Sequence, residues 1–259
     1  MARLCRVLRI SRKTGYNWLS KYKTSGLEEL LKNDLGGRPK KAIPVQVQKA
    51  ILEFRSEFGW NEKQIQFTLN KEMKVSFYTV RQILAQANVL GVAPKRKKYA
   101  YKDFQRPLPN HLWQGDFSLL EEGNYLFALI DDHSRYLVDA QVCSEITTES
   151  ALSVVERAVQ RHGTPFQLMT DHGVQFYNNR SKKPNLFGDT LANWNIEHIL
   201  AGVKHPQTNG KIERWFRTFK DAENRFPELE SYLYYYNFCR PHAGIKYAKP
   251  YEKYFAYKI

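Results

Sequence analysis

Three short apolar runs, separated by polar turns, most constrain how the 259-residue chain can fold. They span 112–120, 125–130 and 136–143, and all three contain mainly aliphatic and aromatic residues. Such runs favour β-strands, and the short polar turns between them favour pairing of neighbouring runs. We therefore expect an antiparallel meander of three strands.

Helical and strand patterns alternate after this meander. A helix is expected to begin at Thr147 or Thr148 and to end near Gly163 and Pro165. In chain order, the elements expected next are a strand over 166–170, a helix ending at Trp194, a strand over 196–200 and a helix beginning after Asn209, which is a good N-cap. The alternation predicts a mixed α/β domain.

Three acidic residues lie in or directly next to the predicted strands and helices. Asp116 lies inside the first run, Asp171 directly follows the strand over 166–170, and Glu213 lies just inside the helix that follows Asn209. A single glutamate on a basic helix is usually solvated surface. The two other acids, both at strands, instead favour a shared site for all three.

Five motifs in chain order carry a resemblance to a known family. They are WQGDFS at 113–118, LIDDHSRY at 129–136, MTDHGVQF at 169–176, HPQTNGKIERWFRTFK at 205–220 and YYYNFCRPHAGI at 234–245. From about residue 104 to 255 the chain resembles insertion-sequence transposases that share the retroviral-type integrase core. The resemblance implies a ribonuclease-H-like integrase core, preceded by an all-α helix-turn-helix DNA-binding region. It also implies a catalytic triad of Asp116, Asp171 and Glu213.

The chemistry that the resemblance implies suits these residue types. Opening a phosphodiester requires a strong nucleophile and stabilisation of charge at phosphorus, and two Mg²⁺ (or Mn²⁺) ions held by carboxylates supply both. Asp116 would bridge both ions, while Asp171 and Glu213 would each hold one. The acids Asp131 and Asp132 follow the second strand, and we assign them to a turn.

Three further polar residues lie near the predicted triad in sequence. His172, Asn209 and Lys211 are expected either to support the acids or to contact DNA.

The positive charge is confined to the first part of the chain. The formal net charge is +14, and residues 1–103 contain 22 Lys and Arg against 8 Asp and Glu, so all of the excess lies there. A basic arm joined to a neutral body suits a protein whose arm binds phosphates and whose body does chemistry. A merely soluble basic segment is the alternative.

The basic arm begins with a helix-turn-helix pattern over residues 1–32. A short helix is followed by Ser11, which can cap a second helix to about Tyr22. The residues expected to pack are Tyr16, Trp18, Leu19 and Tyr22, and those expected to face the major groove are Arg12, Lys13, Thr14 and Asn17. The short first helix leaves open whether the motif is truncated.

Residues 44–90 form a second pattern of three helices. Pro44 suits the first turn of a helix that ends at Phe58, Asn61 opens the next, and Ser76 caps the third. In this second helix-turn-helix-like unit, the exposed residues that would read the DNA sequence are Tyr78, Thr79, Arg81 and Gln82. Alternatively, the unit only separates the first one from the core, and the sequence does not choose between these roles.

Two basic linkers separate these units from each other and from the core over 108–259. The first, 33–43, contains GRPKK, in which Arg38 and Lys40 could enter a minor groove, although a plain linker is the favoured interpretation. The second, 91–107, has a basic run with interleaved aromatics that can follow a DNA backbone or act as a solubilising tether. The basic run consists of Lys95, Arg96, Lys97 and Lys98.

These features predict a DNA transposase that binds the ends of its own element and cuts and joins strands with metal ions. Expected partners are double-stranded element-end and target DNA and further copies of the chain. The alternatives are a catalytically inactive transposon-derived DNA-binding regulator and a nuclease acting on RNA hybrids. Cys5, Cys143 and Cys239 form no pair, so no structural zinc is expected. No apolar run suits a membrane, and we expect a cytoplasmic, nucleoid-associated protein.

Overall fold

The computed structural model describes residues 1–31, 42–91, 105–120, 123–178, 185–202 and 209–256. It divides into two compact units, Met1–Val47 and Gln48–Ile259. Six of the basic residues expected to contact DNA lie outside the described residues, namely Arg38, Lys40, Lys95, Arg96, Lys97 and Lys98.

The first unit consists of two described helices, α1 (Ala2–Val7) and α2 (Arg12–Leu31). Ser11 Oγ accepts a hydrogen bond from the backbone N–H of Thr14 at 3.0 Å, which confirms the predicted cap. The second helix is longer than expected, because it continues past Tyr22 and bends only at Gly26, whose φ is 73°. Glycine tolerates this left-handed conformation at little cost.

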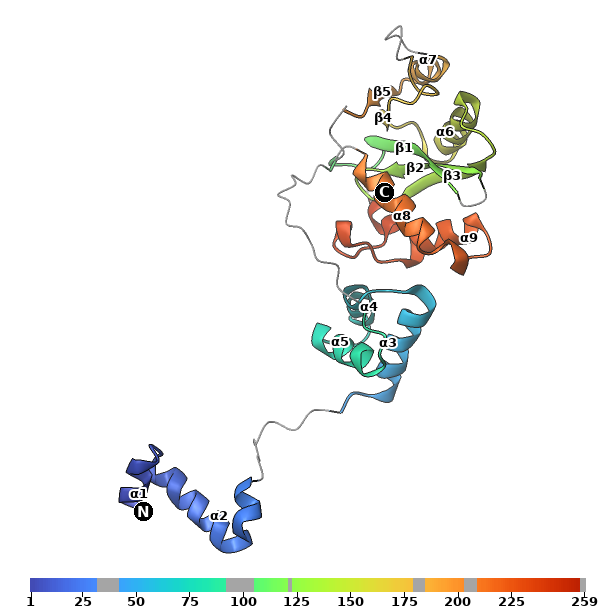
Figure 1. Ribbon diagram of the computed structural model, residues 1–259. Helices are drawn as coiled ribbons and strands as arrows, with labels where there is room; N and C mark the ends of the chain where they lie inside the picture. Colours follow the sequence, from blue (N-terminus) through green and yellow to red (C-terminus); the bar gives the residue numbers. More distant parts are fainter. Residues whose placement is uncertain (32–41, 92–104, 121–122, 179–184, 203–208, 257–259) are drawn as a thin grey trace. The chain divides into compact units, whose positions relative to one another are not determined.

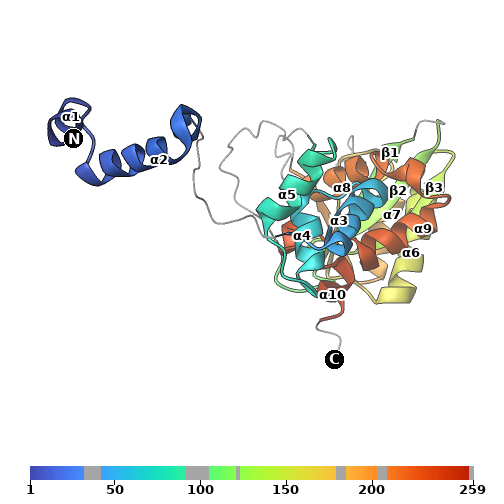
Figure 2. The ribbon, with the colours of Figure 1, turned by 90° about the horizontal axis from the view of Figure 1, so that it is seen from below.

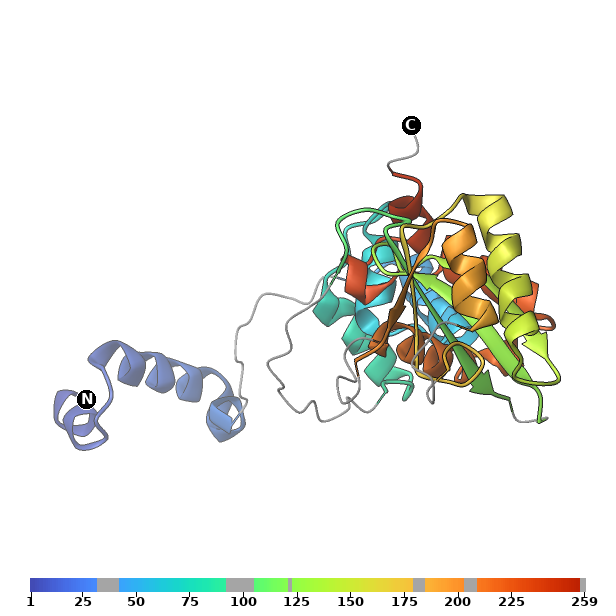
Figure 3. The ribbon, with the colours of Figure 1, turned by 90° about the horizontal axis from the view of Figure 1, so that it is seen from above.

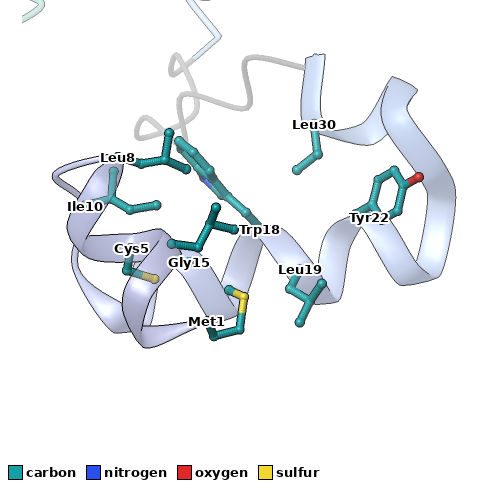
Figure 4. A pocket seen from close by; sticks show the side chains of 10 residues that line it. Met1, Cys5, Leu8, Ile10, Gly15, Trp18, Leu19, Tyr22 and Leu30 are labelled. Atoms are coloured by element: carbon teal, nitrogen blue, oxygen red, sulfur yellow. The ribbon is translucent and has the colours of Figure 1, made fainter.

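The expected packing of the aromatic residues on α2 was largely wrong. Tyr16, Trp18 and Tyr22 are 57%, 49% and 52% exposed, and only Leu19 is half-buried. The short α1 covers one side of α2 and leaves an apolar cavity of about 190 Å³, lined by residues that include Leu4, Leu8 and Trp18 (Figure 4).

The second unit opens with three helices, α3 (Val45–Phe58), α4 (Glu62–Leu69) and α5 (Phe77–Gln86). Their predicted starts are confirmed. Asn61 and Gln64 form a capping box, and Ser76 Oγ accepts from the N–H of Thr79 at 3.0 Å. The buried side chains of these helices include Ile51, Ile65, Val80, Ile83 and Leu84.

A five-stranded sheet is the centre of the second unit. Its strands are β1 (Leu112–Leu119), β2 (Tyr125–Asp131), β3 (Leu137–Cys143), β4 (Gln167–Thr170) and β5 (Glu197–Leu200). The strand order is β3-β2-β1-β4-β5. The first three strands pair antiparallel, as predicted, and β4 runs parallel to β1 and β5. This mixed sheet has the predicted ribonuclease-H-like topology.

Helices cover both faces of the sheet (Figures 1 and 3). They are α6 (Thr148–His162), α7 (Leu186–Asn193) and α8 (Gly210–Lys220). Phe127 and Leu129 of β2 pack with α6 and α7 in one apolar core, so their neighbours on the strand point to the opposite face. That opposite face is the one covered by α8, which packs against β1 and β2.

The sequence also predicts one aromatic-rich helix over 227–239, and the C-terminal segment is continuously helical there, as α9 (Leu229–Tyr234) followed directly by the π-helix η2 (Tyr235–Cys239). The 3₁₀ turn η1 (Glu223–Arg225) precedes this helix, and the 3₁₀ turn η3 (Ala243–Ile245) and α10 (Pro250–Tyr254) follow it. From the sequence, the tyrosines over 232–236 are predicted to pack rather than to stack on nucleic acid. Tyr232, Tyr235 and Tyr236 are buried, as predicted, whereas Tyr234 is 63% exposed.

The helices α3–α5 pack against this C-terminal segment (Figure 2). Trp60 Nε1 donates a hydrogen bond to Tyr235 Oη at 2.6 Å, and the ring of Phe58 stacks on the same tyrosine at 5.4 Å between ring centroids. Gln64 Nε2 donates to the carbonyl of Pro241 at 2.9 Å. These contacts make residues 48–259 one compact unit.

Candidate active site

Strand register brings Asp116 and Asp171 side by side. Gln114 of β1 pairs with Met169 of β4 in the parallel ladder, and continuing that register by two residues makes Asp116 level with Asp171. Asp116 is half-buried inside β1, and Asp171 is half-buried directly after β4. Asp171 Oδ1 also accepts from the N–H of Gly173 at 2.9 Å, which holds the carboxylate at the end of the strand.

The third acid comes from α8, whose position depends on its apolar face. Ile212, Trp215, Phe216 and Phe219 recur at helical spacing and are buried. Glu213 lies in the first turn of the helix and is exposed. Burial of the apolar stripe against the sheet therefore places Glu213 at the end of the helix nearest the site.

The electrostatics of Asp116 show that the three acids interact. Burial, the negative charge of Asp171 and, to a smaller extent, that of Glu213 together raise the pKa of the Asp116 carboxyl to about 7, against a lowering by the hydrogen bond from the Phe117 N–H. Like charges gathered in a partly desolvated place resist ionisation. The sheet and helix therefore create a cluster of negative charge.

Asn209 lies at the N-cap position of α8, but its side chain does not cap the helix. Instead, Asn209 Nδ2 donates to Asp116 Oδ2 at 3.2 Å. The sequence-based expectation of a capping side chain was wrong, because the amide is drawn to the buried carboxylate. Asn209 Oδ1 is buried and has no hydrogen-bond partner among the described residues, so an amide oxygen that can bind a cation lies beside Asp116.

Asp131 and Asp132 lie where β2 ends and a turn begins, as expected, and both are fully buried. Asp131 Oδ1 accepts from the N–H and the hydroxyl of Ser134 at 2.7 and 2.5 Å, and its other oxygen accepts from the N–H of Asn110 at 2.9 Å. Asp131 therefore fixes the turn.

The structure places Lys211 against this turn. Its ammonium group forms an ion pair with Asp132 and donates to the carbonyl of the same residue at 3.2 Å. The side chain is only 16% exposed, and burial lowers its pKa to about 8, with the charge of Arg135 acting in the same direction and Asp132 opposing it. His172 Nε2 lies 2.9 Å from the carbonyl of Ala201.

The described residues that were expected to read DNA lie mostly on exposed helix surfaces. Arg12, Lys13 and Asn17 are exposed in the first turns of α2, and Thr14 is half-buried there. On α5, Tyr78 is 80% exposed, Arg81 and Gln82 are exposed, and Thr79 is half-buried. These residues are accessible to a ligand, and their contact with DNA stays a prediction.

The donor chemistry of the site fits a hard divalent cation. Three carboxylates and the open amide oxygen of Asn209 are all oxygen donors, the kind that Mg²⁺ and Mn²⁺ prefer. Within the described part of the chain, however, no group of three or more His, Cys, Asp and Glu side chains is gathered tightly enough to hold a metal ion. The chemistry of the donors fits, and the side chains have to close further around an ion.

Comparison with known proteins identifies the domains. Residues 106–206 match the integrase core domain, and residues 1–40 match a helix-turn-helix domain. Over these residues the chain is similar to an integrase core domain. The resemblance inferred from the five motifs is therefore confirmed, and Asp116 and Asp171 lie within the matched core.

Two curated relatives extend the comparison. The chain is 29% identical over 149 residues to a putative integrase, ORF3, of Spiroplasma virus SpV1-C74, a match that covers 49% of this chain and 41% of the relative. It is 25% identical over 281 residues to the transposase for insertion sequence IS1202 of Streptococcus pneumoniae, covering 88% of this chain and 59% of the relative. The chain therefore matches only about half the length of these relatives.

A solved integrase core also resembles this one. The catalytic core domain of the HTLV-2 integrase, in complex with magnesium, aligns at 20% identity with a TM-score of 0.46, over 57% of this chain and 98% of that one. No helix in the described segments of this chain has the length and apolar character needed to cross a membrane.

Proposed function

We propose that the integrase core cuts and joins DNA strands by metal-dependent phosphoryl transfer, as a transposase acting on the ends of its own element. The observation that supports this most directly is the raised pKa of Asp116, because it reports two further acids, Asp171 and Glu213, beside a partly buried carboxylate. A structural role gives no reason to bring three acids together when no basic side chain among the described residues forms an ion pair with them. A site for divalent cations does.

Three acids from different elements would provide the metal site. Asp116 on β1, Asp171 at the end of β4 and Glu213 in the first turn of α8 would together hold the metal ions. When bound, Mg²⁺ or Mn²⁺ would activate the attacking oxygen and stabilise the charge that develops at phosphorus. The half-buried position of Asp116 limits access of water and strengthens these interactions.

The helix-turn-helix domain supplies the proposed DNA specificity. Arg12, Lys13 and Asn17 are exposed at the start of α2, where a recognition helix contacts base edges and phosphates. Because joining two element ends to a target requires two sites, we propose that the active form contains more than one copy of the chain. The printed name of the IS1202 relative, a transposase for an insertion sequence, is in keeping with this proposal.

A strand-transfer assay on element-end DNA tests the assignment. Asp116→Asn, Asp171→Asn and Glu213→Gln are each expected to reduce strand transfer by at least about 100-fold, as is typical when a group that stabilises transition-state charge is removed. Asp189→Asn on α7 and Glu230→Gln on α9 change exposed acids outside the site and are the matched controls.

Two results would change the conclusion. Full activity of any one of the three variants would remove that residue from the site. Tight binding of the wild-type protein to element-end DNA, without cleavage in Mg²⁺ or Mn²⁺, would instead favour the inactive DNA-binding regulator.

A further inference from the structure

One buried carboxylate contacts two of the elements that carry proposed catalytic acids, β1 and α8. Asp132 is fully buried at the start of the turn between β2 and β3. Its Oδ1 accepts from Gln114 Nε2 at 2.8 Å and also from the ammonium group of Lys211, while its Oδ2 accepts from the N–H of Arg106 at 2.7 Å. The charge is therefore compensated by one cation and two neutral donors.

The two side chains that bond to Asp132 each lie two residues before a proposed catalytic acid. Gln114 lies two residues before Asp116 on β1, and alternation along a strand puts both on the face covered by α8. Lys211 lies two residues before Glu213, in the same first turn of α8. Asp132 thus connects the strand that carries one acid to the helix that carries another.

We propose that Asp132 is a positioning residue that sets the separation of Asp116 and Glu213 through Gln114 and Lys211. This inference rests on the proposed function, because it concerns the geometry of that same site. Of the two roles expected for Lys211 from the sequence, it selects support of the acids over DNA contact, since the side chain is 16% exposed and directed at Asp132.

The energetics of the Lys211–Asp132 ion pair suit a role in fixing the geometry of the site better than a role in stabilising the fold. Burying an ion pair costs desolvation that its attraction barely offsets, so such a pair adds little net stability. Breaking it is costly, however, and so the start of α8 is held in one place. A displacement of about 1 Å at a reacting centre can reduce a rate by about 100-fold.

Steady-state strand-transfer kinetics on the full chain separate this role from DNA contact. Lys211→Met keeps the length of the side chain and removes its charge, and it is expected to lower kcat at least about 10-fold with KM for DNA changed less than about 2-fold. Lys211→Arg, which keeps the charge, should restore most of kcat. Lys253→Met, at an exposed lysine on α10 outside the five motifs, is the control and should leave both constants unchanged.

A DNA-contacting Lys211 would behave differently. Loss of a phosphate contact weakens DNA binding and reduces the salt dependence of binding by about one unit of slope. A raised KM with an unchanged kcat in Lys211→Met would therefore overturn the proposal.

Hydrogen exchange gives a readout that does not depend on activity. Lys211→Met and Asp132→Asn should speed exchange of the backbone amides at 212–214 by at least about 10-fold, whereas Lys253→Met should not. If the wild-type protein transfers no strands, the proposed function fails while this measurement still decides the positioning role. Unchanged protection in the folded Lys211→Met protein would overturn it.

A milder variant covers the case in which the loss of Lys211 unfolds the protein. Gln114→Met removes only a neutral hydrogen bond to Asp132 at similar side-chain volume. It is expected to lower kcat about 3-fold or more without changing KM, and wild-type kinetics in this variant would count against the proposal.

Discussion

Asn209 donates its side-chain amide to the Asp116 carboxylate at 3.2 Å, across 93 residues of sequence. The contact joins the residue that precedes α8 to the centre of β1, and so it ties the helix that carries Glu213 to the strand that carries Asp116. With the N–H of Phe117 on the other oxygen at 2.8 Å, both oxygens of Asp116 have a donor. An ion that binds Asp116 therefore has to share these oxygens or displace the amide.

Asn209→Asp tests how strongly the surroundings of Asp116 repel a further negative charge. A fourth carboxylate beside Asp116 should lower the free energy of unfolding of the metal-free protein by about 1–2 kcal/mol, because like charges resist being held together. Added Mg²⁺ or Mn²⁺ should raise the Tm of this variant more than that of the wild type. Thermal melts in EDTA and in excess metal are the measurement.

The control for this experiment is Asn209→Ala, which removes the hydrogen bond without adding charge. It should cost about 1 kcal/mol in the metal-free protein, and added metal should raise its Tm less than that of Asn209→Asp. An equal metal response in Asn209→Asp and Asn209→Ala would show that Asp116 is not part of a cation site.

Local signals in the sequence were sufficient to predict most elements. The caps at Ser11, Asn61, Ser76 and Thr147 use side chains that bond to backbone within three residues, so the sequence contains the whole interaction. The order of strands and helices likewise follows from periodicity and turns. The approach of Asp116 to Asp171 then follows from the parallel pairing of β1 with β4.

The interactions that the sequence did not reveal are long-range. Asn209 has the residue type of a cap but bonds to a carboxylate on another element, and Lys211 looks like a surface cation but is buried against Asp132. Gln114 gave no signal at all, because a glutamine inside an apolar strand has meaning only once its partner is known. Such contacts depend on which faces the fold brings together.

The packing of α3–α5 on the C-terminal helices predicts a measurable coupling. Trp60 is 4% exposed and donates to Tyr235 Oη at 2.6 Å, so Tyr235→Phe leaves a buried indole N–H without its acceptor. We expect a loss of about 1–2 kcal/mol in the free energy of unfolding, measured by urea denaturation. Trp60→Phe should cost a similar amount or more, because the larger ring is also lost.

The double variant Trp60→Phe with Tyr235→Phe identifies the interaction itself. Both polar partners are then absent, so the two losses should not add, and a coupling of about 1 kcal/mol is expected. Additive losses would mean that the hydrogen bond contributes nothing to the stability of residues 48–259.

The close approach of α1 to α2 predicts a sensitive position in the first unit. A Cβ built on Gly15 would collide with the sulfur of Cys5, which is 2% exposed. Gly15→Ala should therefore displace α1 and destabilise the helix-turn-helix by about 1–3 kcal/mol. Labelling of Cys5 by iodoacetamide, followed by mass spectrometry, should be several-fold faster than in the wild type.

The matched control for Gly15→Ala is Ser20→Ala, an exposed position on the same helix. It should leave the labelling of Cys5 unchanged. Slow labelling in both variants would mean that α1 accommodates the extra methyl group without moving.

His198 on β5 predicts how stability changes with acid. Its Nε2 lies 2.8 Å from the Thr170 hydroxyl, which donates to the Asp171 carbonyl at 3.1 Å, and burial lowers the pKa of the imidazole to about 4. The unfolded chain, with a pKa near 6.5, therefore takes up this proton first as the pH falls. The stabilisation that the neutral His198 contributes is fully present above about pH 6.5 and is lost as the pH falls through 4.

His198→Gln should reduce the fall in unfolding free energy between pH 7 and 4 by roughly 2 kcal/mol, after allowance for partial exposure. Urea denaturation of both proteins at pH 7, 5.5 and 4 measures the difference, and parallel curves would show that His198 is not held neutral by the fold.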